Sequence, residues 1–369
     1  MSKAAELAKW GEVSTNGQVS GRRNIIINGA MNVAQRATSA TGVGASNAYF
    51  TVDRMYMLAS TAGRLTMTQT ADGPSGFANC IKLDCTTADT SVAAGEYFVL
   101  AYHMEGQDLQ QLKKGTSDAE TVTVSFYVKG NASATYTCEF RDVENTRYSS
   151  QEFSVTTSWN RVSLTFDGDT VGALSDDTTG RMYLYFWLHA GSTYAGGTHT
   201  SNAWHTTDAN RMSDSQTSIV DSTDRTFFIT GLQFEVGSVA TPFEHRSFGE
   251  ELALAQRYYT VVAHGAASQD GTSHPISMGS QYGTDVLYSN LELPCDMRTT
   301  PTLEIVSATN YYTFFRNGGG DTVDDFTLTK WGTRVIEFYN NSDVSGTAGH
   351  AGFIRTANSA AKFALTAEL

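Results

Sequence analysis

Apolar and polar residues alternate with a period of two along most of the chain after residue 50. In the run VTVSFYV, which spans 122–128, four apolar side chains alternate with Thr, Ser and Tyr. Alternation of this kind is typical of strands that bury one face. Many short strands at this spacing predict a β-sandwich of the jelly-roll type. Further alternating segments, separated by turns, are 136–140, 162–166 and 227–236.

The segment 182–188 (MYLYFWL) is apolar on both faces, which predicts a central strand that is covered on both sides. After residue 260, short apolar runs predict a second and smaller set of strands. These runs are 291–293, 303–305, 312–314, 326–328, 335–338, 353–354 and 362–369. We therefore predict an all-β fold with two β-sandwich domains, the first of them jelly-roll-like.

One helix is clearly indicated between the two sets of strands, at 247–259 (SFGEELALAQRYY). Ser247 and Glu250 have the spacing of a capping box, and acidic residues occupy the first turn, where the helix dipole favours them. Four residues share one face of this helix, and we expect that face to be buried against a domain or a second subunit. They are Phe248, Leu252, Ala255 and Tyr259.

The first 48 residues are predicted to form an anchor and a linker. Residues 3–10 could form a short helix, which is marginal in water without a partner surface, and 24–36 begins with a strand-like apolar run. The predicted boundaries are 1–48 for the anchor and linker, 49–246 for the jelly-roll domain, 247–260 for the connecting helix and 261–369 for the C-terminal sandwich.

The chain is acidic, with a formal net charge of −13, and only 17% of its residues are charged. Nucleic acid is a disfavoured partner, because its affinity comes largely from cations that neutralise phosphates. The same charge disfavours adsorption to anionic lipid. No stretch has the length and composition of a signal peptide or a membrane span, so we expect folding in a cytoplasm and no membrane insertion.

Sequence motifs for catalysis are missing. The chain has no GxSxG, no HExxH and no phosphate-binding loop. Acidic residues cluster in predicted turns at 167–177 and 321–325, where they usually cap their own backbone, whereas a glycoside hydrolase places a carboxylate pair in a cleft. The spacing of His199 and His205 does not suit a helix-borne metal pair. We therefore predict a protein that is not an enzyme and has neither metal nor cofactor.

The loop at 191–218 is the strongest candidate for a binding surface. It places aromatic rings among Gly, Thr, Ser and Asn, and such rings can stack on sugars while neighbouring polar groups bind hydroxyls. The candidate glycan contacts are Tyr194, Trp204, His205 and Arg211. The alternative for Trp204 is that its ring covers the edge of the sandwich.

Two segments carry a family resemblance. NIIINGAMNVAQR at 24–36 resembles the N-terminal signature of many bacteriophage tail-fibre and appendage proteins, and GLQFEVGSVATPFEHRSFGEELALAQRYY at 231–259 resembles their hinge segment. LPCDMRTTPT at 293–302 and the final AEL fit the same group. The resemblance implies a virion component that is made in the host cytoplasm, attaches by its N-terminus and forms a homotrimer. It also implies a first domain similar to a carbohydrate-binding-module jelly roll, and it carries over no catalytic residues.

The leading hypothesis is a tail fibre or related appendage that binds host surface polysaccharide and contacts other tail or neck proteins. One alternative is a purely architectural virion protein, such as a fibre adaptor or a capsid decoration, without receptor binding. A third possibility is a glycan depolymerase. The candidate residues for attachment to the particle are Leu7, Trp10, Ile25, Ile26, Ile27 and Met31.

Overall fold

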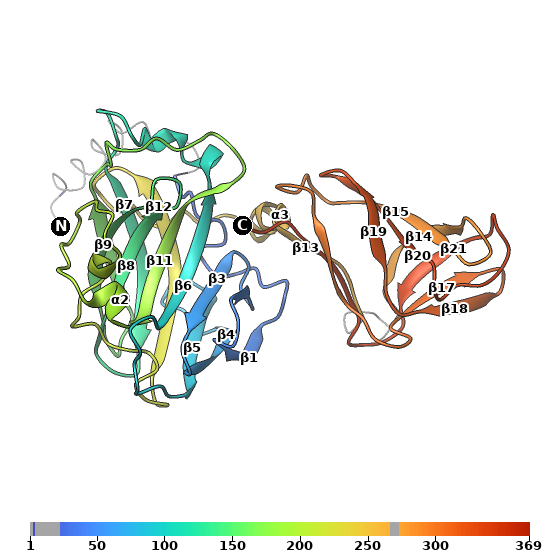
Figure 1. Ribbon diagram of the computed structural model, residues 1–369, viewed down its shortest axis with the longest axis horizontal. Coiled ribbons are helices and arrows are strands. Elements are labelled where there is room, and N and C mark those ends of the chain that lie inside the picture. The colour runs from blue at the N-terminus through green and yellow to red at the C-terminus, as the bar shows by residue number, and fades with distance from the viewer. Residues whose placement is uncertain (1–2, 4–22, 266–272) are drawn as a thin grey trace. The chain divides into compact units, whose positions relative to one another are not determined.

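The computed structural model of the protein describes residues 3, 23–265 and 273–369. The chain divides into two units (Figure 1). Unit 1 holds the described residues up to Glu251 together with Leu369, and unit 2 holds those of 252–368. Both units are built mainly from antiparallel strands, which confirms the predicted all-β fold. None of the described helices has the length and apolar character needed to cross a membrane.

Unit 1 contains two six-stranded antiparallel sheets within its described residues (Figure 1). The first sheet has the strand order β1 (Ser39–Val43), β4 (Arg64–Thr70), β5 (Cys80–Thr87), β12 (Thr226–Val236), β7 (Val122–Gly130) and β10 (Asn160–Phe166). The second sheet has the strand order β2 (Ala48–Tyr49), β3 (Met55–Ser60), β6 (Tyr97–Glu105), β11 (Gly180–Ala190), β8 (Ala134–Asp142) and β9 (Arg147–Val155).

The core of unit 1 draws alternate side chains from strands of both sheets, as the period of two predicts. Strand β7 contributes Val122, Val124, Phe126 and Val128. Strand β11 contributes Met182, Leu184, Phe186 and Leu188. The intervening side chains of β11, Tyr185 and Trp187, are also buried, but on the opposite face of the sheet. The apolar run at 182–188 therefore belongs to a strand that is covered on both sides, as predicted.

Four of the six proposed attachment residues are described, and two of these four lie in the interior of unit 1. Ile26 and Met31 are fully buried in the core, and Ile25 packs against it while its backbone N–H donates to Phe234 of β12 at 3.0 Å. Ile27 is half-buried. The prediction that Ile26 and Met31 form a surface for a partner is wrong, because their burial closes the sandwich. Leu7 and Trp10 lie outside the described residues.

The segment 24–28 is hydrogen-bonded to the segment that leaves unit 1. The Glu251 carboxylate accepts the backbone N–H of Asn28 at 2.7 Å, and Glu244 accepts that of Asn24 at 2.7 Å. The Arg246 guanidinium donates to the carbonyl of Ile26 at 3.0 Å and lies 3.5 Å from Glu251. The segment 24–36 thus meets the part of 231–259 that belongs to unit 1, so residues 24–48 belong to the sandwich and do not form a separate linker.

A buried ammonium joins two loops of unit 1 to the end of strand β8. The Nζ atom of Lys114 lies 2.5 Å from Asp142 and 3.0 Å from Asp169, and it donates to the carbonyls of Val171 at 2.9 Å and Gly172 at 2.8 Å. Arg147 binds Asp169 with two hydrogen bonds. Burial would raise the pKa of Asp169, but the hydrogen bonds from Arg147 and Lys114 outweigh it and hold the pKa below its usual value.

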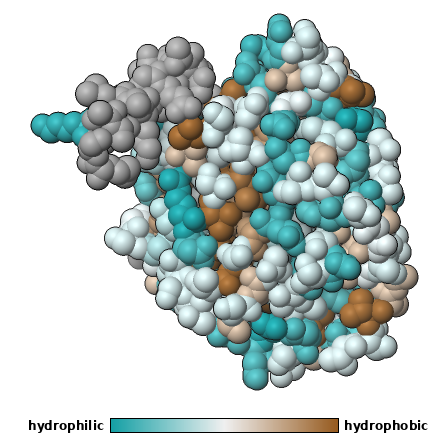
Figure 2. All heavy atoms as spheres, turned by 90° about the vertical axis from the view of Figure 1, so that its left-hand side faces the viewer, coloured by the Kyte–Doolittle hydropathy of each residue, from teal (hydrophilic) through white to brown (hydrophobic). Residues whose placement is uncertain are grey.

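The surface of the protein is mostly polar but weakly charged. On the face in Figure 2, most residues are hydrophilic or of intermediate hydropathy, and apolar residues form a narrow band near the middle of the face and a few separate spots around it. This pattern agrees with a sequence in which only 17% of residues are charged. Hydroxyls, amides and aromatic rings, more than charges, are therefore the groups that this surface offers to a ligand.

Unit 2 contains a three-stranded and a seven-stranded sheet within its described residues. The smaller sheet has the order β13 (Tyr259–His264), β22 (Lys362–Thr366) and β16 (Thr302–Val306). The larger has the order β18 (Gly319–Val323), β17 (Tyr312–Arg316), β21 (Ala351–Thr356), β14 (Pro275–Gln281), β15 (Leu287–Glu292), β20 (Val335–Asn340) and β19 (Thr327–Trp331). Their shared core includes Phe314, Phe338 and Phe363.

The helix between the two sets of strands, α3 (Phe248–Gln256), is shorter than predicted. Its start is as expected, since the Ser247 hydroxyl accepts the backbone N–H of Glu250 at 3.3 Å. A tightened turn, in which the Tyr258 N–H donates to the Ala255 carbonyl, ends it before residue 259.

The predicted buried face of this helix is wrong at Phe248, which is 59% exposed. Tyr259 is fully buried as predicted, but it is not helical: it is the first residue of β13 and pairs with Thr366 of β22. Leu252 is half-buried, and Ala255 is fully buried.

Candidate functional site

The outer face of the second sheet carries a group of aromatic side chains. On β11, Tyr183, Tyr185 and Trp187 point away from the core, because they alternate with the core residues of the same strand. In the antiparallel register, Tyr185 lies opposite Ala101 of β6, whose small side chain leaves room beside the ring. Neighbouring strands add Tyr56, Leu58, Tyr97 and Val99 to this face.

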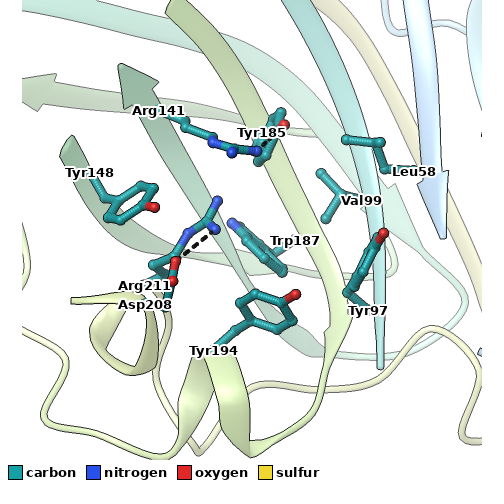
Figure 3. Close-up of a pocket in the computed structure, with 10 residues that line it drawn as sticks. All are labelled: Leu58, Tyr97, Val99, Arg141, Tyr148, Tyr185, Trp187, Tyr194, Asp208 and Arg211. Carbon is teal, nitrogen blue, oxygen red and sulfur yellow. Dashed lines mark hydrogen bonds and ion pairs between the residues drawn. The ribbon is translucent and has the colours of Figure 1, made fainter. Parts of the chain in front are cut away.

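The loop at 191–218 folds over this face and turns it into a pocket. It contains the short helix α2 (Ser192–Ala195) and a 3-10 helix at Asp208–Asn210. The loop is fixed to β9 by a β-bridge, in which Tyr148 and His205 exchange backbone hydrogen bonds of 2.8 and 2.9 Å. The cavity measures about 250 Å³ (Figure 3), and its lining consists of Leu58, Tyr97, Val99, Arg141, Tyr148, Tyr185, Trp187, Tyr194, Asp208 and Arg211.

A buried ion pair fixes the wall of the pocket. Arg211 donates to both oxygens of Glu139, from Nε at 2.7 Å and from Nη2 at 2.9 Å. The indole N–H of Trp187 donates to the same carboxylate at 2.7 Å. Glu139 is fully buried, and Arg211 is 4% exposed. A carboxylate with three such donors holds the indole and the guanidinium in one geometry.

Aromatic rings surround the guanidinium of Arg211. Its Cζ atom lies 4.2 Å from the ring centre of Tyr148, 4.8 Å from that of Trp187 and 5.6 Å from that of Tyr194. Its Nη1 atom lies 3.3 Å from the carboxylate of Asp208. Cation–π attraction is strong for a desolvated cation. Arg211 therefore organises the rings of the pocket from within.

Two tyrosines remain partly exposed and form the mouth of the pocket. The rings of Tyr97 and Tyr194 meet edge to face, with centres 5.7 Å apart. Tyr194 also lies 5.1 Å from Trp187. At another part of the lining, Arg141 donates to the hydroxyl of Tyr185 at 3.0 Å. Burial raises the pKa of Tyr185 to about 12 despite this guanidinium, so the phenol stays neutral and can donate a hydrogen bond.

The structure brings only part of the predicted glycan contacts to this pocket. Tyr194 and Arg211 line it, although Arg211 serves as a buried support and not as an exposed contact. His205 lies outside the lining, where its backbone and its ring support Tyr148. Trp204 also lies elsewhere in unit 1.

Trp204 covers the edge of the sandwich, as the alternative interpretation had it. Its indole N–H donates to the carbonyl of Asp167 at 2.8 Å, and its ring packs against the main core. The Nζ atom of Lys114 lies 5.5 Å from the ring centre. A cavity of about 20 Å³ beside it has room for little more than a water molecule. Trp204 is therefore a structural residue in this geometry.

Several residues of the pocket were not singled out from the sequence. They are Tyr97 and Val99 on β6, Arg141 on β8, Tyr148 on β9, and Tyr185 and Trp187 on β11. The aromatic residues at alternate positions of β11 were the available signal, because a strand that buries both faces must be covered by a second layer. Glu139 gave no signal, since a single acidic residue in a strand does not reveal its partner.

A buried histidine on this face makes the stability of unit 1 sensitive to pH. His103 of β6 stacks on Tyr183 with ring centres 3.8 Å apart, and its side chain is almost fully buried. Burial lowers the pKa of His103 to about 3, and the charges of Arg54 and Arg141 act in the same direction. The unfolded chain, with a histidine pKa of about 6.5, therefore binds the proton first as the pH falls.

We expect unit 1 to lose about 1–2 kcal/mol of stability from His103 alone between pH 6.5 and pH 5, and to keep this contribution above pH 6.5. The variant His103→Gln, which cannot titrate, is expected to flatten the pH dependence of the unfolding midpoint over this range. The exposed His245 provides the control His245→Gln, which should retain the wild-type slope. Equal slopes in all three proteins would contradict the assignment.

No protein-family model and no curated protein matches the sequence. Among solved structures, the enzymatically active domain of bacteriophage CBA120 tailspike protein 4 is similar at 13% identity with a TM-score of 0.32, covering 59% of this chain and 22% of the tailspike domain. The chain thus spans about a fifth of the length of that domain.

Two carbohydrate-binding modules are similar over most of their own length. The family 11 module from Clostridium thermocellum, solved with a mixed-linked β-1,3-1,4 tetrasaccharide, shows 8% identity and a TM-score of 0.28, covering 56% of this chain and 99% of the module. The CBM22-1 xylan-binding domain from Paenibacillus barcinonensis shows 12% identity and a TM-score of 0.27, covering 56% and 100%. At these values the similarity does not identify a function for this chain.

Proposed function

We propose that unit 1 binds a glycan in the pocket on the outer face of its second sheet. The supporting observation is the combination of partly exposed Tyr97 and Tyr194 at the mouth with a rigid polar interior. Aromatic faces pack against the C–H groups of sugar rings, and polar groups fix the hydroxyls. A cavity of about 250 Å³ suits one sugar residue of a longer chain.

The interior of the pocket is organised before any ligand arrives. Trp187 and Arg211 are both held by the buried Glu139 carboxylate, so their positions do not depend on a ligand. Sites of this kind bind more tightly because less side-chain freedom is lost on binding. The arrangement also suits binding better than cleavage, since the carboxylates of Glu139 and Asp208 both contact Arg211. We therefore propose a binding module and not an enzyme.

We expect Tyr194→Ala and Tyr97→Ala each to weaken glycan binding by about tenfold, because each removes a ring from the mouth of the pocket. Hits would first be found on an array of bacterial surface polysaccharides, and the strongest would then be titrated by calorimetry. Tyr282→Ala is the matched control, because Tyr282 is a highly exposed tyrosine of unit 2. An array without hits, or equal affinities for all variants, would contradict the proposal.

We further propose that the protein is a structural component of a phage virion, a tail fibre or a related appendage, that contacts host surface polysaccharide. The resemblance of 24–36 and 231–259 to such proteins supports this proposal. Virion proteins of the tail or neck would be its partners, and the homotrimer remains a prediction. Measurement of the mass in solution tests the trimer. Deletion of residues 1–22, which removes none of the described core residues, tests attachment by the N-terminus.

Two outcomes would favour the alternative functions. Incorporation into particles together with an empty glycan array would favour an architectural protein, such as a fibre adaptor or a capsid decoration. Release of new reducing ends from host polysaccharide would favour a depolymerase. Each outcome comes from a different assay, so the three functions can be separated.

A further inference from the structure

We infer that the glycan bound by this pocket carries a negatively charged group, a carboxylate or an acid ester, which pairs with Arg141. The inference rests on the proposed glycan site and narrows its ligand to acidic saccharides. It follows from the different settings of the two arginines that line the cavity, Arg141 and Arg211.

Arg141 lies on β8 with its side chain on the outer face of the sheet. In the register of the sheet it lies opposite Tyr183 of β11 and Tyr148 of β9, so aromatic residues flank it on both sides. Its Nη1 atom donates to the hydroxyl of Tyr185 at 3.0 Å, and its Cζ atom lies 5.8 Å from that ring. Figure 3 shows the guanidinium beside Tyr185 at the wall of the cavity.

The guanidinium of Arg141 still has donors to offer. It is only half-buried, and no carboxylate lies within ion-pair distance of it among residues 23–265 and 273–369. A guanidinium has five N–H donors, and one hydrogen bond to Tyr185 leaves most of them available. The planar fork matches the oxygens of a carboxylate, a sulfate or a phosphate group.

Arg211, in contrast, is already neutralised. Glu139 binds it with two hydrogen bonds, Asp208 contacts its Nη1 atom, and aromatic rings cover its faces. A ligand could pair with it only by displacing a buried carboxylate, which is costly. Of the two arginines that line the cavity, Arg141 is therefore the one that a ligand can reach and that no carboxylate of the described residues neutralises.

The other charges of the protein disfavour the binding of an anionic ligand outside this pocket. The net charge of −13 repels polyanions at long range, so adsorption of an acidic polymer outside the pocket is disfavoured. Asp208, which is exposed at the cavity wall, opposes an anionic ligand within the pocket. Arg141 and Asp208 should therefore act in opposite directions on the same ligand.

The test measures the affinity of the strongest glycan hit before and after removal of its charged group. The wild type is compared with the variants Arg141→Gln, Arg141→Lys and Asp208→Asn. Carbodiimide activation followed by borohydride reduction converts carboxylates to alcohols, mild solvolysis removes sulfate esters, and phosphatase removes phosphate monoesters. We expect the matching treatment and Arg141→Gln each to weaken binding by roughly ten- to hundredfold. Arg141→Lys should restore part of the affinity, and Asp208→Asn should strengthen binding several-fold.

The matched control is Arg225→Gln, which removes the same charge from a surface ion pair with Asp221. Its affinity should equal that of the wild type, and unfolding midpoints show whether each variant is folded. A neutral glycan as the strongest hit would overturn the inference while leaving the glycan site intact. The inference would also be overturned if Arg141→Gln lost as much affinity for the glycan without its charged group as for the same glycan with it. Failure of every glycan to bind would overturn the proposed function itself.

Discussion

Replacement of Lys114 by alanine is expected to lower the free energy of unfolding of unit 1 by about 3–5 kcal/mol, because it removes one partner of a buried ion pair and leaves the other in place. The ammonium is enclosed by the carboxylates of Asp142 and Asp169 and by two backbone carbonyls. Without it, the fully buried Asp142 carboxylate loses the cation at 2.5 Å and keeps the hydrogen bonds from Asn145. Urea unfolding followed by tryptophan fluorescence measures the loss.

The neighbouring lysine supplies the control. Lys113 is exposed and pairs with Glu120 at 2.6 Å on the surface, so Lys113→Ala should leave the unfolding midpoint almost unchanged. Three of the four tryptophans among the described residues belong to unit 1, so fluorescence reports mainly on this unit. Similar small effects for both lysines would show that water reaches the Lys114 site.

Replacement of Arg211 by alanine is expected to have an effect of the same order, about 3–5 kcal/mol, and to abolish glycan binding as well. It removes the guanidinium from the buried Glu139 carboxylate, which then keeps the indole of Trp187 as its one side-chain donor among the described residues. The rings of Tyr148 and Tyr194 lose the cation on which they pack. Stability is measured by urea unfolding and binding by calorimetry.

A double substitution separates charge from packing at this site. Arg211→Met with Glu139→Gln removes both charges, fills most of the volume and keeps an acceptor for Trp187. This pair should recover much of the stability lost in Arg211→Ala, because replacing both partners costs far less than leaving one of them alone. A double variant as unstable as the single one would mean that packing of the guanidinium, and not the unpaired charge, is decisive.

The strands of this protein could be predicted because the alternation of apolar and polar residues depends only on neighbouring positions in the sequence. Alternation in the run that became β7 places Val124 and Phe126 on one face whatever the strand pairs with. The order of strands could not be predicted, since β12 pairs with β5 and β7, which are distant in sequence. The burial of the apolar run at 25–27 could not be predicted for the same reason, because Phe234, whose carbonyl accepts the N–H of Ile25, lies more than 200 residues away.

The pocket was predictable only in part. The loop that closes it was recognised from Tyr194 and Arg211 among polar residues, whereas its floor comes from Trp187, on a strand read as core. Trp204 attracted attention because it is aromatic and lies in a polar loop, yet its ring packs on the sandwich. Which ring of a loop faces a ligand depends on where the loop crosses the sheet, and the sequence does not record that crossing.

The hydrogen bonds between the first described segment of unit 1 and the segment that leaves the unit have a mechanical consequence. Asn24 and Ile26 are tied to Glu244 and Arg246, so these two segments adjoin. We expect a pulling force applied between residues 24 and 251 to act first on this short clasp, before it reaches the sheets. In a single-molecule stretching experiment, the clasp should set the rupture force, and Arg246→Ala should lower that force before any strand unravels.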